Sequence, residues 1–280
     1  NYGVDSRLEF ANRHFFNGMT YDLQMGVRYE DQTFKNKNRE GEEGEILTFG
    51  NRGALEEQQN LDAEAFAAYL QVALHVTPSL TITPGVRFES YDTAFRAVAG
   101  DDEVLEFFDE FGDLKSSHNE VLPGISFAWE VAPRSTVYGS YHRGLTPHII
   151  RDVLGDPFDD AIAAGEGAAF AANYKIEDEI GDNFQLGYRT SAVRGVTLDV
   201  AVFHNRIKNY QFGEAFQSEE GDRVFSAIEE ATFQGFEIGA RIDSHPLVGG
   251  PWNVFAEATY TYTDSEIKKN EGNPGTKGNE

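Results

Sequence analysis

Apolar and polar residues alternate along short stretches of the chain, and the clearest example lies in residues 121–147. The apolar row there is Val121, Pro123, Ile125, Phe127, Trp129 and Val131, and small or polar residues stand between its members. Because successive side chains of a strand point to opposite faces, this alternation predicts a strand with one apolar face. A turn around Pro133 and a second strand over 135–143 follow. The stretch therefore predicts a β-hairpin.

The same unit of strand, tight turn, strand and long connection recurs through the chain. The predicted strands are 3–12, 20–31, 64–76, 80–90, 121–131, 135–143, 182–190, 196–206, 231–243 and 252–264. The predicted long connections are 32–62, 91–120, 145–181 and 208–230, and an Ala/Gly-rich part of the third, 161–172, could form a short helix. Pro84 lies inside a strand but cannot donate a hydrogen bond, which predicts a bulge or a locally broken ladder.

Strict alternation of short and long connections predicts an up-and-down antiparallel sheet with all long connections on one rim. The polar rows carry ionisable side chains: Arg28, Glu30, Arg87, Glu89, Glu130, Arg189, Asp199, Glu237, Arg241 and Glu257. A transmembrane β-barrel turns its apolar row to lipid and keeps a polar interior, in which we expect Arg28, Arg87, Glu89, Arg189, Glu237 and Arg241 to form ion pairs. Aromatic residues near the strand ends fit an interfacial girdle: Tyr21, Tyr29, Trp129, Tyr141, Trp252 and Tyr262. The pattern favours an all-β transmembrane barrel over a soluble sheet, whose apolar row a second sheet would bury.

Composition changes the picture mainly by exclusion. The 280 residues contain no cysteine and carry a formal net charge of −24, which argues against a nucleic-acid partner. No enzyme motif orders the Ser, His and Asp residues, and we expect neither catalysis nor a cofactor. The acidic stretch 101–113 lacks the spacing of a calcium-binding loop, so no metal site is expected.

Seven stretches carry a resemblance to a known family. They are NYGVDSRLEF (1–10), VTPSLTITPGVRFE (76–89), VLPGISFAWEVAP (121–133), YGSYHRGLTP (138–147), DNFQLGYR (182–189), VFHNRIKNY (202–210) and ATFQGFEIGAR (231–241). Together they resemble the barrel of TonB-dependent outer-membrane receptors, in the branch that contains the ferric citrate receptor.

The resemblance implies a fold and a function. Such receptors have a twenty-two-stranded barrel with short periplasmic turns and long extracellular loops, plugged by an N-terminal domain that TonB contacts. We therefore expect residues 1–280 to be a partial barrel of about ten strands without the plug and the C-terminal strands. The implied function is active uptake of a ferric siderophore, a ferric citrate-like chelate, across the outer membrane of a Gram-negative bacterium. The alternatives are a passive porin and a receptor of the same fold for a non-iron ligand.

The partners that the resemblance implies are TonB, the ferric siderophore, outer-membrane lipid and lipopolysaccharide, to which divalent cations could bridge the acidic loops. Arginine is the expected ligand donor because its planar guanidinium binds carboxylate oxygens in pairs. Arg143 and Arg151, at the top of a strand that opens into a large loop, are the leading candidates. The further candidates are Arg39, Arg52, Arg96, Tyr91, His118, His142 and His148. In so acidic a chain each arginine could instead pair with a neighbouring carboxylate, and the same acidity would slow the approach of an anionic ligand.

Overall fold

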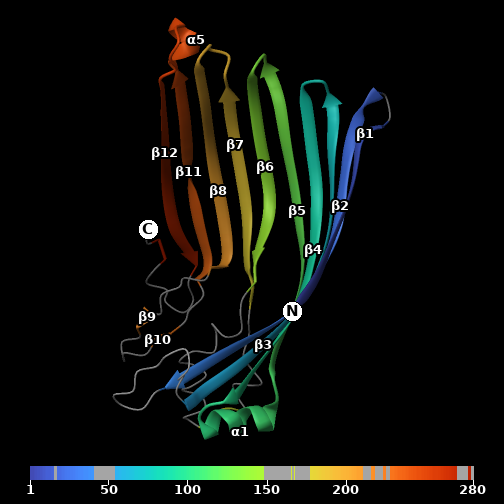
Figure 1. Ribbon diagram of the computed structural model, residues 1–280, viewed down its shortest axis with the longest axis vertical. Coiled ribbons are helices and arrows are strands. Elements are labelled where there is room, and N and C mark those ends of the chain that lie inside the picture. Colours follow the sequence, from blue (N-terminus) through green and yellow to red (C-terminus); the bar gives the residue numbers. More distant parts are fainter. Residues whose placement is uncertain are drawn as a thin grey trace.

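The structure is a computed structural model that describes residues 1–15, 18–40, 54–147, 165, 167, 177–210, 216–217, 223–224, 228–269 and 277–278. One antiparallel sheet of ten strands dominates it, in the order β1-β2-β3-β4-β5-β6-β7-β8-β11-β12. Figure 1 shows the strands side by side, with the short turns at the top and the long connections and α1 at the bottom. We call these the turn end and the loop end. The sheet confirms the predicted up-and-down fold.

The strands of the sheet are longer than their predicted lengths. Their bounds are β1 Tyr2–His14, β2 Thr20–Glu40, β3 Ala54–Thr77, β4 Leu80–Ala99, β5 Leu114–Ala132, β6 Ser135–Thr146, β7 Glu179–Thr190, β8 Val196–Tyr210, β11 Ile228–Asp243 and β12 Phe255–Lys269. Two short strands, β9 (Phe216–Gln217) and β10 (Arg223–Val224), pair with each other outside the sheet. The helices are α1 (Asp102–Phe111) and α5 (Ser244–Val248). No helix in the described part of the chain is long and apolar enough to cross a membrane.

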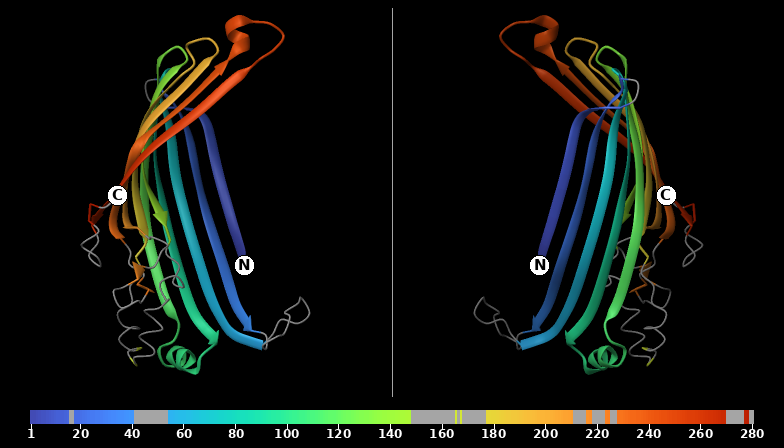
Figure 2. Two further views of the ribbon diagram at one scale, coloured as in Figure 1. Left: turned by 90° about the vertical axis from the view of Figure 1, so that its left-hand side faces the viewer. Right: turned by 90° about the vertical axis from the view of Figure 1, so that its right-hand side faces the viewer.

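The sheet is curved like part of a barrel wall (Figure 2). Its register aligns the apolar positions of neighbouring strands in tiers, for example Leu186, Val202, Phe236 and Tyr262 on β7, β8, β11 and β12. We call this row of each strand the outer row and the alternate positions the inner row. Phe66 and Leu70, which a soluble sheet would bury, are 41% and 43% exposed on the outer row. An exposed apolar face of this extent is what a transmembrane barrel presents to lipid.

Two predicted long connections are wrong in extent. The region 32–62 is largely strand, because β2 continues to Glu40 and β3 begins at Ala54. The region 91–120 consists of the end of β4, α1 and the start of β5. Beyond the apolar band both faces of a strand meet water. Charged residues can therefore occupy both rows while backbone pairing continues, and their appearance does not mark the end of the strand. The predicted helix at 161–172 lies almost wholly outside the described residues.

The prediction of a broken ladder at Pro84 is confirmed. Between β3 and β4 the pairs Gln71↔Gly85 and Leu74↔Ile82 keep one register, but Thr83 and Pro84 have no partner on β3. On its other side Pro84 pairs with Ile125 of β5. The proline therefore interrupts one ladder without shifting the strands.

The main buried core lies at the loop end, where α1 packs against the inner row of β4 and β5. Phe107 and Phe108 of the helix bury with Phe95, Ala97 and Leu114. Phe95 and Ala97 stand an even number of positions after Arg87 on β4 and therefore share its inner row. Leu114 belongs to the same row because it pairs with Phe95. Helix α1 therefore covers the inner side of the wall at its loop-end rim.

Candidate ligand-binding site

Ion pairs line the inner row of the wall, as predicted. Arg28 pairs with Glu30 and Arg87 with Glu89, each two residues further along the same strand. Arg189 of β7 pairs with Asp199 of β8. Each of these guanidinium groups is therefore bound by a carboxylate of the wall itself, which fits a structural role in a polar lumen.

The wall is interrupted between β5 and β6 near the loop end. These strands pair only from Gly124↔His142 to Ala132↔Ser135. Beyond that point residues 114–123 of β5 pair with β4 alone, and residues 143–146 of β6 pair with β7 alone, among the residues that the structure describes. We call this opening the β5–β6 gap.

A hollow of about 470 Å³ lies at the base of the β5–β6 gap. Gly85 and Gly124, which pair directly across β4 and β5, contribute backbone instead of side chains to its wall. Inner-row residues Arg87 and His142 line it together with outer-row Arg143. An open concavity with a few convergent polar groups is the kind of place where a small ligand binds.

A buried polar cluster spans the β5–β6 gap nearer the rim. The Tyr91 hydroxyl donates a hydrogen bond to Asp178, which lies just before β7. The rings of Tyr91 and His118 stack with centroids 4.9 Å apart. Nδ1 of His118 is 3.0 Å from Oδ2 of Asp178, an ion-pair distance, although not aligned as a hydrogen bond. The cluster fastens the start of β7 to β4 and β5 across the gap.

Comparison with known families now identifies the barrel. Residues 1–280 match the family described as TonB dependent receptor-like, beta-barrel. The chain belongs to the TonB-dependent receptor family. The loop end of this receptor barrel is accordingly its extracellular end, and the turn end faces the periplasm. No curated protein sequence matches the chain.

Solved structures of the same fold include several receptors. The ferric citrate transporter FecA in its unliganded form superposes with a TM-score of 0.70 at 19% identity, covering 95% of this chain and 35% of that one. The siderophore receptor PiuA from Acinetobacter baumannii gives 0.64 at 17% identity over 99% of this chain and 41% of that one. The pyoverdine receptor FpvA from Pseudomonas aeruginosa PAO1 gives 0.63 at 14% identity, over 96% and 36%. The chain thus spans well under half the length of these receptors.

Arg143, a leading candidate from the sequence, lies on the outer row of the receptor wall. It shares that row with Tyr141, which pairs with lipid-facing Ile125. Its Nε and one terminal nitrogen bind the two oxygens of Asp182 at 3.0 and 3.3 Å, and the Tyr141 hydroxyl donates to Asp182 at 2.8 Å. Asp182 lies beyond the apolar band, and these donors, Arg143 first, hold the pKa of its carboxyl below the usual value. The guanidinium fork is therefore already occupied by a carboxylate.

The other candidates fall into three groups. His142 is exposed on the inner row and lines the hollow, while Tyr91 and His118 meet in the buried cluster. Arg96 binds Asp109 at 2.8 Å and Asp113 at 3.2 Å at the rim, and Arg39 also has an interaction partner. Arg52, Arg151 and His148 lie outside the described residues.

Sequence reasoning missed Asp178 and the role of the paired glycines. Asp178 stands in a predicted connection among several other acidic residues, with no local pattern that sets it apart. Gly85 and Gly124 lack a side chain at inner-row positions. Aligning the two predicted strands in register would have placed these glycines opposite each other. Among the described residues no group of three or more His, Asp or Glu side chains could hold a metal ion.

Proposed function

We propose that this chain is part of an outer-membrane receptor that takes up a ferric siderophore with energy delivered through TonB. The family match over residues 1–280 carries the proposal. The polar, ion-paired inner row supports it, because such a row suits a lumen filled by a polar domain rather than by lipid. TonB would act through a plug domain N-terminal to this barrel.

The ligand that we propose first is a ferric citrate-like chelate. The sequence resemblance to the ferric citrate receptor branch and the similarity of fold to FecA support it. Structures of similar fold also include a ferric-catecholate import receptor and a copper transporter, so the fold alone does not select the ligand.

We propose that the barrel part of the binding site is formed by inner-row residues at the β5–β6 gap. His142 lines the hollow, and Tyr91 and His118 stand above it towards the extracellular rim. Arg143 also lines the hollow, from the outer row, and would have to release Asp182 to bind a ligand there. Arg96 would contribute from the rim, and Arg52 and Arg151, which lie outside the described residues, are further proposed contacts.

A second candidate is a neutral or cationic chelate, or a ligand without iron. The described rim arginines Arg96 and Arg143 are both bound by carboxylates, which an anionic ligand would have to displace. The net charge of −24 disfavours the approach of anions in the same way.

Lipid and lipopolysaccharide are the partners that we propose for the outer face. An aromatic tier, Tyr141 and Phe184, bounds the apolar band at the extracellular side. Charged pairs follow directly beyond it, Arg143 with Asp182 and Arg206 with Glu230. This order matches the change from acyl chains to charged head groups.

Binding to the purified full-length receptor tests the ligand and the site together. We expect titration calorimetry to show saturable binding of ferric citrate, which His142→Ala weakens about tenfold or more through loss of a ligand contact. Arg206→Ala is the control, because Arg206 pairs with Glu230 and does not line the hollow, and it should change the affinity little. If the receptor binds only a neutral or cationic ferric siderophore, that chelate takes the place of ferric citrate as the proposed ligand. Equal effects of the two variants would contradict the assigned site, and no saturable binding of any chelate would favour a porin.

A further inference from the structure

The periplasmic turn between β11 and β12 differs from the other turns of the sheet. Residues 78–79 and 133–134 are enough to connect β3 with β4 and β5 with β6, whereas residues 244–254 separate β11 from β12 and include α5. This segment contains no Asp, Glu, Lys or Arg, in a chain in which 25% of the residues are charged. We call residues 244–254 the α5 foot.

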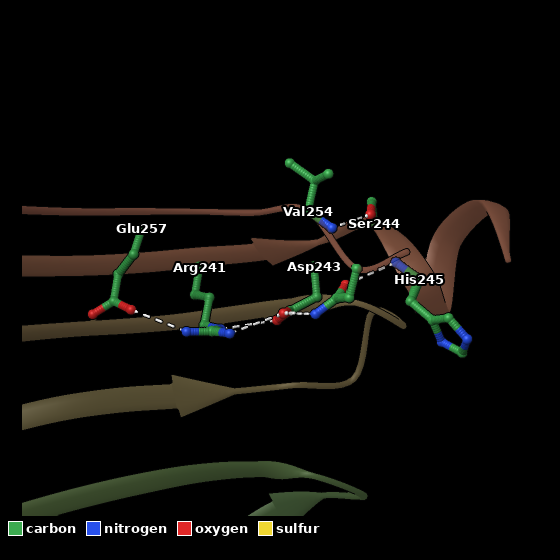
Figure 3. A network of polar contacts seen from close by, with 7 residues as sticks. Arg241, Asp243, Ser244, His245, Val254 and Glu257 are labelled. Atoms are coloured by element: carbon green, nitrogen blue, oxygen red, sulfur yellow. Dashed lines mark hydrogen bonds and ion pairs between the residues drawn. The ribbon is translucent and has the colours of Figure 1, made fainter. Parts of the chain in front are cut away.

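A polar frame holds the α5 foot in one conformation (Figure 3). Asn253 donates from Nδ2 to Asp243 at 3.0 Å and accepts from the backbone nitrogen of His245 at 3.0 Å. Ser244 and Val254 close the neck of the foot with two hydrogen bonds of 2.8 Å, one from each backbone nitrogen. Asp243 is held in turn by Arg241 at 3.0 Å. The α5 foot is thus ordered by hydrogen bonds between its own residues and by its bond to Asp243 at the end of β11.

The frame presents apolar side chains to the outside. Val248 is 82% exposed and Trp252 is 80% exposed, and Val254 and Leu247 are also exposed. Val254 lies opposite Ser244, one step beyond the last ladder pair Asp243↔Phe255, so it continues the outer row of Ala256 and Ala258. The apolar surface of the foot is therefore continuous with the lipid-facing band.

We propose that the α5 foot rests in the periplasmic leaflet of the outer membrane, with Val248 and Trp252 at the boundary between head groups and acyl chains. Tryptophan favours this boundary because its ring is amphipathic, and an uncharged segment avoids the cost of moving charges towards lipid. A periplasmic protein partner is the other possible occupant of an apolar surface. Continuity with the lipid-facing row and the absence of charge favour lipid.

Nitroxide labels on introduced cysteines test the depth of the foot. The full-length receptor, freed of other cysteines, would be reconstituted in phosphatidylethanolamine–phosphatidylglycerol vesicles and labelled at Val248→Cys or Trp252→Cys. Ser79→Cys, in a short periplasmic turn, is the aqueous control, and Ile238→Cys, on the outer row of β11, is the lipid control. We expect the labels at 248 and 252 to be more accessible to oxygen and less accessible to a water-soluble nickel chelate than the label at 79.

Accessibilities to oxygen and to the nickel chelate that are equal for the labels at 248, 252 and 79 would overturn the proposal. The foot would then lie in water or against a protein. Val248→Cys keeps Trp252 in place, so the test stands even if the Trp252 variant fails to insert. Asn253→Ala provides a second measurement. It removes the central hydrogen bonds of the frame, so we expect faster motion of the label at 248 and no change at 238. Unchanged motion at 248 would contradict the role of the frame.

Discussion

At the scale of single residues, the inner wall depends on close contacts between aromatic rings and glycines. Gly187 lies directly opposite Tyr138 in the β6–β7 ladder, and a Cβ atom at position 187 would overlap the tyrosine ring. The ring is held over the glycine because its hydroxyl donates to Asp199 at 2.7 Å and the Arg189 guanidinium lies 5.7 Å from its centre. Gly26 and Tyr69 form a similar pair between β2 and β3.

Gly187→Val tests this contact. The added side chain should expel the Tyr138 ring and break its bond to Asp199, which we expect to lower the free energy of unfolding by about 1–3 kcal/mol. Urea unfolding of the refolded full-length receptor, followed by fluorescence, measures the change. Gly239→Val is the control, because a Cβ atom there meets nothing within 4 Å. The account fails if both variants lose the same stability.

At the scale of elements, α1 depends on the phenylalanines that it buries against the wall. Phe108 is 1% exposed and contacts both Phe95 and Phe107. Phe108→Ala should cost about 3–5 kcal/mol, enough to release the helix while the long β4–β5 ladder persists. Hydrogen exchange should therefore accelerate over 102–111 and stay slow in β4. The half-exposed Phe111 offers the matched variant Phe111→Ala, for which we expect a much smaller effect; slower or unchanged exchange after Phe108→Ala would contradict this role.

The alternating pattern predicted the strands, their order and the row that faces outward, because lipid on one side enforces a period of two. It did not predict where strands end beyond the membrane, as at Glu40 and Ala99, since both faces are wet there. The helix α1 was missed although Val104, Phe107, Phe108 and Phe111 follow a helical spacing between acidic residues. The many acidic residues between these apolar positions favoured the interpretation of the segment as a loop.

The candidate site was predictable only in part. The inner or outer placement of His142 and Arg143 follows from counting along β6, since neighbours occupy opposite rows. The cluster of Tyr91, His118 and Asp178 joins residues far apart in the chain, and only the paired register of β4 and β5 brings the first two together. No local sequence signal could have placed Asp178 beside them.

At the scale of the whole molecule, the outer and inner faces of the wall have the opposite characters of a transmembrane barrel. Exposed apolar tiers face lipid and ion pairs face the lumen, and a hollow lined by residues of both rows lies at the β5–β6 gap. A passive porin also has a polar lumen, so the wall alone does not separate the two functions. The difference lies in the energy source, because a receptor that holds its ligand tightly must be driven to release it.

Uptake of radiolabelled ferric citrate by cells that carry the full-length protein and no other iron receptor tests this claim most directly. The measurement compares cells with and without TonB, and cells whose inner-membrane proton gradient has been collapsed. We predict saturable uptake in the intact cells that falls to background when either TonB or the gradient is lost. Uptake that continues unchanged without TonB would contradict the account and show a passive channel.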